Sequence, residues 1–192
     1  MAGRLIYVMG PSGAGKDTLL QGVMGLLASS GCQIARRVIT RPVEASEPNT
    51  VPVTLTEFLQ LEACGALAMA WRANGLAYGI PREIDDRLSR GQDVLVNGSR
   101  AYLPEARKRY ENLVAVLLTV DSNTLLARLK NRGRETDTQI QARMARNSLF
   151  DPLVCQADGR MGGSVFVVDN SGGIDQAVQS VAMYLEKDRV CD

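Results

Sequence analysis

The feature that most constrains this chain is a glycine-rich turn between two apolar segments. Its residues, here called the phosphate loop, are Gly10, Pro11, Ser12, Gly13, Ala14, Gly15, Lys16, Asp17 and Thr18. The run Leu5–Met9 before it is apolar, and apolar residues recur with helical spacing after it. A strand, a glycine-rich turn and a helix in this order are typical of a loop that binds nucleotide phosphates. A turn without a ligand is the alternative, and the flanking patterns argue against it.

The residue types in this loop match the chemistry of a nucleoside triphosphate. Glycines allow backbone angles at which successive N–H groups converge on phosphate oxygens, and the following helix directs its positive end at the same oxygens. Lys16 is positioned to reach the β- and γ-phosphates as a point charge. We therefore predict that residues 10–18 bind ATP and that Lys16 is catalytic.

Asp17 departs from the usual loop pattern, in which a Ser or Thr hydroxyl after the lysine helps to hold Mg²⁺. A carboxylate is also a hard oxygen ligand suited to Mg²⁺. Thr18 cannot take over that role, because one helical residue corresponds to a rotation of about 100°. We predict Asp17 as the metal ligand; the alternative is that it only caps or electrostatically favours the helix start.

Composition narrows the class of protein. Lys and Arg number 22 against 21 Asp and Glu, which argues against a general binder of nucleic acid or anionic membranes. No apolar stretch has the length of a membrane span, and the 4 cysteines are far apart, as in a reduced cytoplasmic protein. Histidine is absent, so the chemistry rests on lysine, arginine, carboxylates and an oxygen-bound metal. Phosphoryl transfer meets this constraint, because it relies on positioning and charge stabilisation. No oligomeric state is predicted.

The apolar pattern predicts a doubly wound parallel α/β sheet in one domain, residues 1–192. The expected strands, separated by helices, cover residues 5–9, 33–39, 93–97, 113–120 and 165–168. The region from about 38 to 90 interrupts this alternation and is predicted to be an inserted acceptor-binding subdomain. It contains a loop over 42–52, a short helix capped by Thr54 or Thr56, and a hairpin around Asn74-Gly75.

Arginines gather where the ligands of open α/β sheets bind. Arg36, Arg37 and Arg41 end or follow the second expected strand, and a second group surrounds residues 131–133. A single arginine is more often a solvated surface charge, but guanidinium groups match phosphate geometry when several flank the ligand-binding edge. The second group comprises Arg128, Arg132, Arg134, Arg143 and Arg146. The exit of the last strand, residues 169–172, is either an adenine contact or a plain turn.

These motifs resemble nucleoside monophosphate kinases, most closely the guanylate kinase group. The phosphate loop, Thr40-Arg41-Pro42, Gly75-Leu76-Ala77-Tyr78-Gly79 and the segment 128–135 carry the resemblance. It implies that Arg41 and Tyr78 hold the acceptor's phosphate and that residues from about 128 to 146 form an arginine-bearing lid. The positions that read guanine do not match, because they fall near Met69 and Pro81, and the strand that should end in aspartate ends in Asn97.

The residues that depart from the guanylate kinase pattern resemble those of the ribose 1,5-bisphosphate phosphokinase family. The resembling segments are the Gly-Lys-Asp of the loop and residues 71–79, 94–100 and 131–135. The resemblance implies ATP-dependent phosphorylation of ribose 1,5-bisphosphate to 5-phosphoribosyl 1-diphosphate, with Mg²⁺ as cofactor. The implied partners are the small molecules ATP and ribose 1,5-bisphosphate. We predict Arg132 and Arg134 as catalytic residues of the lid. The predicted substrate-binding residues are Arg37, Arg41, Tyr78, Asn97 and Arg143, with Arg36 as the alternative to Arg37. A guanylate kinase and a non-catalytic guanylate-kinase-like module are the alternative functions.

Overall fold

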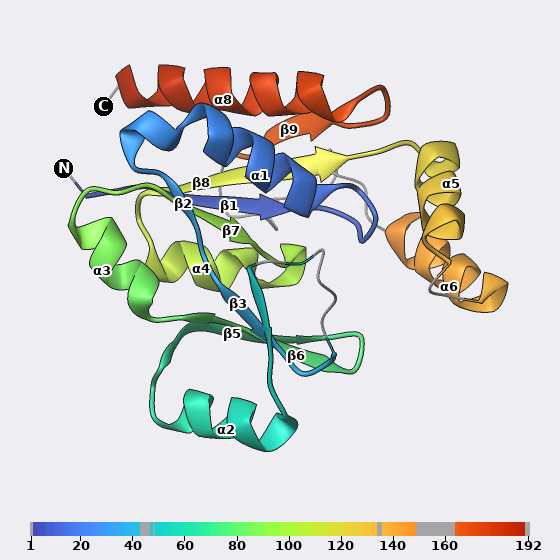
Figure 1. Ribbon diagram of the computed structural model, residues 1–192, viewed down its shortest axis with the longest axis horizontal. Helices are drawn as coiled ribbons and strands as arrows, with labels where there is room; N and C mark the ends of the chain where they lie inside the picture. Colours follow the sequence, from blue (N-terminus) through green and yellow to red (C-terminus); the bar gives the residue numbers. More distant parts are fainter. Residues whose placement is uncertain (1, 43–46, 48, 134–135, 149–163, 191–192) are drawn as a thin grey trace.

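A five-stranded parallel sheet forms the centre of the molecule (Figure 1). The computed structural model describes residues 2–42, 47, 49–133, 136–148 and 164–190. The strands are β1 (Leu5–Met9), β2 (Gln33–Ile34), β7 (Val94–Asn97), β8 (Leu113–Thr119) and β9 (Phe166–Asp169). Their order is β2-β7-β1-β8-β9, and every neighbouring pair is parallel. The predicted parallel α/β sheet is therefore confirmed, with the phosphate loop after its central strand.

Helices cover both faces of this sheet (Figure 1). On one face lie α1 (Lys16–Leu26) and α8 (Ile174–Val190), which pack against each other. On the other lie α3 (Glu83–Ser89) and α4 (Leu103–Arg109). Two short 3₁₀ helices, η1 (Ala28–Ser30) and η2 (Arg100–Tyr102), follow α1 and β7. The phosphate loop thus lies at the carboxyl edge of a sheet that is protected from water on both faces.

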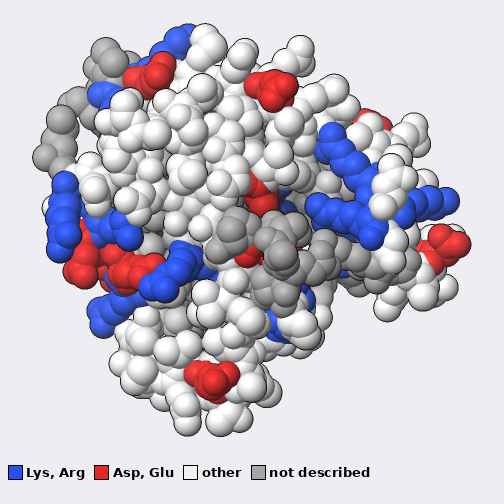
Figure 2. Space-filling view, viewed as in Figure 1, with Lys and Arg blue, Asp and Glu red and all other residues white. Residues whose placement is uncertain are grey.

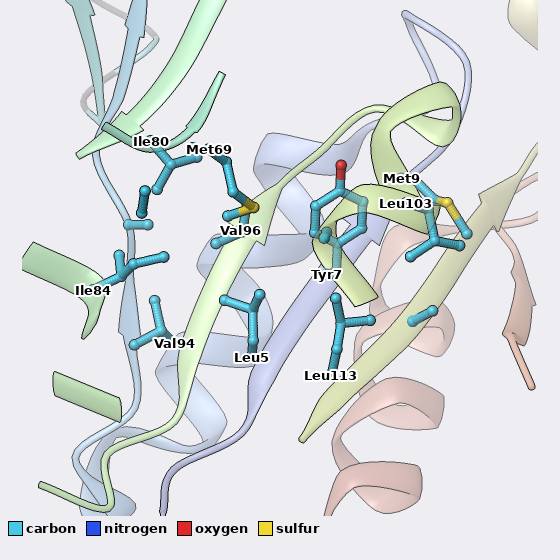
Figure 3. Close-up of a cluster of buried hydrophobic side chains, with 14 of the residues drawn as sticks. Leu5, Tyr7, Met9, Met69, Ile80, Ile84, Val94, Val96, Leu103 and Leu113 are labelled. Atoms are coloured by element: carbon cyan, nitrogen blue, oxygen red, sulfur yellow. The ribbon is translucent and has the colours of Figure 1, made fainter. Parts of the chain in front are cut away.

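The central strand divides its side chains between two cores. Leu5, Tyr7 and Met9 belong to the cluster on the α3 and α4 side (Figure 3), whereas Ile6 and Val8 belong to the cluster under α1 and α8. All five residues are at most 1% exposed. This explains why β1 is a continuous apolar run, since successive strand residues point to opposite faces and both faces are buried.

A second, four-stranded sheet extends from the first (Figure 1). Its strands are β3 (Arg37–Ile39), β4 (Thr50–Pro52), β5 (Leu67–Ala73) and β6 (Leu76–Pro81), in the order β4-β3-β6-β5. The predicted hairpin is present: β5 and β6 are antiparallel, and Asn74 and Gly75 have φ of 53° and 74° in the turn. Helix α2 (Leu55–Ala63) covers this sheet, and Thr54 is its N-cap in a capping box with Glu57.

Two details of the predicted secondary structure are wrong. The expected strand over 33–39 is split: β2 pairs with β7 in the central sheet, whereas β3 pairs with β4 and β6 in the second. The chain leaves the central sheet after Ala35, and Val38 packs against Phe58 and Ala77 in a separate core. The expected loop over 42–52 also ends in β4, because its last residues pair with β3. Both segments are short, and tertiary pairing overrides their local pattern.

Two further helices lie beyond the carboxyl edge of the central sheet (Figure 1). These are α5 (Ser122–Arg132) and α6 (Asp137–Ser148). Asp121 caps α5, because its side chain accepts hydrogen bonds from the backbone N–H groups of Asn123 and Thr124. Their small core of Leu125, Leu129 and Ile140 joins α5 to α6 as one unit next to the phosphate loop.

Candidate active site

The phosphate loop connects β1 to α1 in a conformation that requires glycine at its end. Gly15 is the N-cap of α1 with φ 92° and ψ 23°, a left-handed conformation that is unfavourable for residues with a side chain. A Cβ at this position would also lie 2.8 Å from Nδ2 of Asn170. The loop therefore delivers the unpaired N–H groups and the positive end of α1 to its concave side, as an anion-binding site needs.

Lys16 lies against the loop that it is predicted to serve. Its Nζ donates hydrogen bonds to the carbonyl oxygens of Gly10 and Pro11, both at 3.0 Å. Burial lowers the pKa of Lys16 to about 8, Asp17 counteracts this shift, and the positive charges of Arg37, Arg100 and Arg132 add to it. The charges of these three arginines thus act on the Lys16 ammonium, and a polyphosphate is the kind of ligand that relieves such repulsion.

Asn170 supports the phosphate loop from the last strand of the sheet. Its side chain is 2% exposed and donates through Nδ2 to the carbonyl oxygen of Ala14 at 2.7 Å. Arg128 donates through Nη2 to the backbone oxygen of Asn170 at 2.9 Å. Sequence reasoning considered residues 169–172 as an adenine contact or a turn and missed this support. An Asn after a terminal strand gives no local signal of a contact with Ala14, 156 positions away in the chain.

Asp17 and Asn97 form a hydrogen-bonded pair across the site. Asn97 is the last residue of β7 and is 8% exposed, and its Nδ2 donates to Oδ1 of Asp17 at 2.7 Å. Parallel pairing of β1 with β7, with Val8 opposite Asn97, brings the two together. Gly15, not Asp17, is the N-cap of α1, and no side-chain cap bond is present there. Asp17 therefore makes no capping hydrogen bond, although its carboxylate lies in the first turn of α1, where it favours the helix start electrostatically.

A cavity of about 230 Å³, here called the acceptor-side cavity, opens between α1, β2 and the second sheet. Arg37 contributes to it, and its guanidinium lies 5.9 Å from the centre of the Tyr78 ring, which stacks on Trp71. Four of the predicted site residues, Asp17, Thr18, Arg37 and Asn97, therefore share one cavity. Its lining residues are Asp17, Thr18, Leu20, Gln21, Ile34, Ala35, Arg37, Glu47, Asn49, Thr50 and Asn97.

Arg41, the other predicted phosphate ligand of this region, is paired with a carboxylate. Its Nη2 lies 2.9 Å and 3.1 Å from the two oxygens of Glu47, and its Nη1 donates to the backbone oxygen of Pro42. Glu47 lines the acceptor-side cavity, so the ion pair brings Arg41 to its border. Sequence reasoning did not identify Glu47, because a lone glutamate in a loop is usually a solvated charge.

The predicted lid residues lie on α5 and α6, where Figure 2 shows a concentration of Lys and Arg side chains. Arg132 ends α5, and its charge acts on Lys16. Arg143 donates through Nη1 to Oγ of Ser12 at 3.0 Å, so it contacts the phosphate loop instead of the acceptor-side cavity. Arg134 lies outside the described residues. The structure thus separates Arg143 from the other predicted substrate-binding residues.

A clustered metal site and a membrane-spanning helix are both absent from the described part of the chain. Within the described ranges, no three or more Asp, Glu, Cys and His side chains are grouped to hold a metal ion. Mg²⁺ in phosphoryl-transfer sites takes most of its ligands from phosphates and water, so a site with one carboxylate is compatible with it. None of the helices among the described residues has both the length and the apolar character to cross a membrane.

The central sheet, the phosphate loop and the inserted second sheet define a P-loop kinase fold of the nucleoside monophosphate kinase type. A solved guanylate kinase from Anaplasma phagocytophilum superimposes with a TM-score of 0.65 at 17% identity, over 97% of this chain and 86% of that one. A gluconokinase from Sinorhizobium meliloti gives a TM-score of 0.54 at 18% identity, over 97% and 93%. Identities this low establish the fold alone. No family model matches the chain.

Curated relatives specify the family. The chain is 52% identical over 191 residues to the ribose 1,5-bisphosphate phosphokinase PhnN of Pseudomonas paraeruginosa, and the match covers 100% of both. It is 50% identical to the protein of that name from Pseudomonas fluorescens, over 97% of this chain and 96% of the relative. Identity to the Azotobacter vinelandii protein is 48% over 100% of both chains. This chain belongs to the ribose 1,5-bisphosphate phosphokinase family and is an ATP-dependent phosphotransferase.

Proposed function

We propose that the chain transfers the γ-phosphoryl group of ATP to the 1-phosphate of ribose 1,5-bisphosphate. An oxygen of the 1-phosphate attacks the γ-phosphorus, and the bond from that phosphorus to the β,γ-bridging oxygen breaks. The products are 5-phosphoribosyl 1-diphosphate and ADP. The acceptor oxygen is already an anion, so no strong general base is needed, in keeping with a chain without histidine.

The observation that supports this proposal is the identity of the residues at the two positions where a guanylate kinase would bind guanine. Met69 is 1% exposed and packs in the apolar core with Ile80, and Pro81 has no hydroxyl. Guanine would leave polar edges without partners there, at about 1–3 kcal/mol for each lost hydrogen bond. The acceptor-side cavity instead contains a guanidinium, a carboxamide and hydroxyls from Arg37, Asn97 and Thr50, groups suited to phosphates and sugar hydroxyls.

Each predicted site residue has a role in this scheme. The phosphate loop, residues 10–18, binds ATP, and Lys16 bridges its β- and γ-phosphates. Arg37, Arg41 and Tyr78 bind the acceptor's phosphates, for which Arg41 exchanges Glu47 for a phosphate. Arg132 and Arg134 act from the lid on the transferred group and exclude water. Arg143, predicted to bind substrate, contacts Ser12 and is assigned to the ATP side of the site.

Asp17 is the residue that we assign to Mg²⁺, with Asn97 as its support. The Asn97 amide holds Oδ1 of the Asp17 carboxylate. No hydrogen bond to Oδ2 of Asp17 is recorded among the described residues, so this oxygen can face a cation. The ion, when bound, would neutralise charge on the β- and γ-phosphates. The donor set fits, because it is a hard oxygen ligand on an exposed residue beside the loop that binds the phosphates.

The test is a competition between acceptors. The purified protein is given ATP and Mg²⁺ with either ribose 1,5-bisphosphate or GMP, and ADP is assayed together with ³¹P NMR of the products. We expect a diphosphate at carbon 1 of the sugar and little or no GDP. The Lys16→Ala protein, prepared identically, controls for contaminating kinases. Efficient GDP formation, with ribose 1,5-bisphosphate left unreacted, would favour the guanylate kinase alternative. No ADP formation with either acceptor would favour the non-catalytic module.

A further inference from the structure

The turn after β7 brings a residue outside the predicted site to the phosphate loop. Residues 97–100 read Asn-Gly-Ser-Arg, and Asn97 already contacts Asp17. Because β7 and β1 are parallel neighbours, their carboxyl ends lie side by side, and the N–H of Gly98 donates to the carbonyl oxygen of Val8 at 2.8 Å. Arg100 opens η2 at this point. Its backbone is therefore fixed to the strand from which the phosphate loop emerges.

Tyr7 makes this attachment rigid. Its hydroxyl donates to the backbone oxygen of Ser99 at 2.9 Å and accepts from the backbone N–H of Ser99 at 2.8 Å. The ring is fully buried, in the apolar cluster of Figure 3. Gly98 lies directly on this ring, since a Cβ there would be 2.0 Å from Cζ of Tyr7. The backbone position of Arg100 is thus fixed by a buried tyrosine, by a glycine without space for a methyl group and by two hydrogen bonds.

Arg100 adjoins the phosphate loop in a cavity other than the acceptor-side cavity. It lines a second cavity of about 270 Å³, here called the lid-side cavity, together with Pro11 of the phosphate loop. The two cavities share no described lining residue. Lys16 donates to the carbonyl oxygen of Pro11, so both cations adjoin the same part of the loop. The other lining residues are Leu117, Leu118, Thr119, Val120, Ser122, Leu125, Met144 and Asn147.

We infer that Arg100 is a catalytic residue that binds the γ-phosphate of ATP. The loop lysine marks the β- and γ-phosphates, and Arg100 lines the cavity that borders the same part of the loop, at Pro11. Its positive charge acts on the Lys16 ammonium together with those of Arg37 and Arg132. A guanidinium presents a fork of donors to the oxygens of a transferring phosphoryl group, on which charge is spread in the transition state. The inference rests on the proposed function only for the identity of the acceptor.

The decisive experiment measures binding without any acceptor. Calorimetry gives the dissociation constants of ADP and of AMP-PNP, the analogue with an imido group between the β- and γ-phosphates, for wild type and Arg100→Ala. We expect the preference for AMP-PNP over ADP to fall about tenfold, as the loss of one charge-assisted contact predicts, with ADP affinity within about twofold of wild type. Arg100→Lys, which keeps the charge without the fork, should lose less.

Arg72→Ala is the matched control, because Arg72, on β5 of the second sheet, is an exposed arginine paired with Glu62 of α2. It should leave both dissociation constants unchanged. Equal weakening of ADP and AMP-PNP binding by Arg100→Ala would make Arg100 a structural support of the loop. Wild-type dissociation constants for both nucleotides would remove Arg100 from the site; either result overturns the inference. If Arg100→Ala does not fold, Arg100→Lys decides the question by the same ratio. Failure of the acceptor proposal is distinct, since it would appear in wild type with both nucleotide affinities intact.

Discussion

Exchanging the Asp17–Asn97 pair tests whether the carboxylate that organises Mg²⁺ has moved from the strand end into the phosphate loop. In Asp17→Ser the site gains a neutral hydroxyl but loses the carboxylate that we assign to Mg²⁺. Two unit charges about 4 Å apart attract by about 1 kcal/mol in water, and a divalent ion doubles this to about 2 kcal/mol. The value for water applies, because Asp17 is exposed. A loss of about 2 kcal/mol corresponds to about 30-fold weaker Mg²⁺ affinity.

The assay is a Mg²⁺ titration of the initial rate at fixed ATP. We expect Asp17→Ser to need about 30-fold more Mg²⁺ for half its maximal rate. Its thermal unfolding should change little, since Gly15 is the N-cap of α1 and Asp17 makes no capping bond. Asp17→Ser/Asn97→Asp is the reciprocal control: it restores one carboxylate on the other side of the 2.7 Å contact and should recover most of the Mg²⁺ affinity. Superimposable titrations of wild type and Asp17→Ser would refute the reasoning, as would a double variant no better than the single one.

Three further predictions concern the loop lysine, the lid and the frame behind Arg100. Lys16→Ala should unfold at the wild-type temperature but lose at least about 100-fold in turnover, because the lysine contacts phosphate and not the core; turnover within a few fold of wild type would contradict this. Arg132→Ala should lower kcat more than it raises the KM for ATP, because its contact strengthens as charge develops; a change in KM alone would make Arg132 a ground-state anchor. Gly98→Ala should lower the free energy of unfolding in denaturant by at least about 3 kcal/mol, because its Cβ would overlap the Tyr7 ring. The control Gly25→Ala on α1, where a Cβ meets nothing within 4 Å, should raise it by about 0.5–1 kcal/mol. Similar stabilities of the two variants would show that Tyr7 does not constrain the turn.

Much of the fold could be predicted because its signals are local. A glycine-rich turn between a buried strand and a helix admits few structures, and the continuous apolar runs of β1, β7 and β8 have the pattern of strands buried on both faces. The hairpin at Asn74-Gly75 and the capping box at Thr54 are likewise written in neighbouring residues. Lys16, Asp17, Arg37 and Asn97 could be proposed as site residues because they sit at strand ends or within the loop itself.

What the sequence alone determined about this protein is its phosphate loop, the parallel sheet and the kind of chemistry a chain without histidine can perform. Tertiary structure alone decided the split of residues 33–39 between two sheets, the pairing of Arg41 with Glu47 and the position of Arg143 beside Ser12. It also decided that Asn170 supports Ala14. Tyr7 likewise fixes the turn before Arg100 through Ser99, which is 92 positions away from Tyr7 in the chain. The physical reason is that strand and turn signals depend on neighbours in the chain. The contacts of a polar side chain depend instead on which distant carboxyl, carbonyl or ring the packed sheet brings within about 3 Å of it.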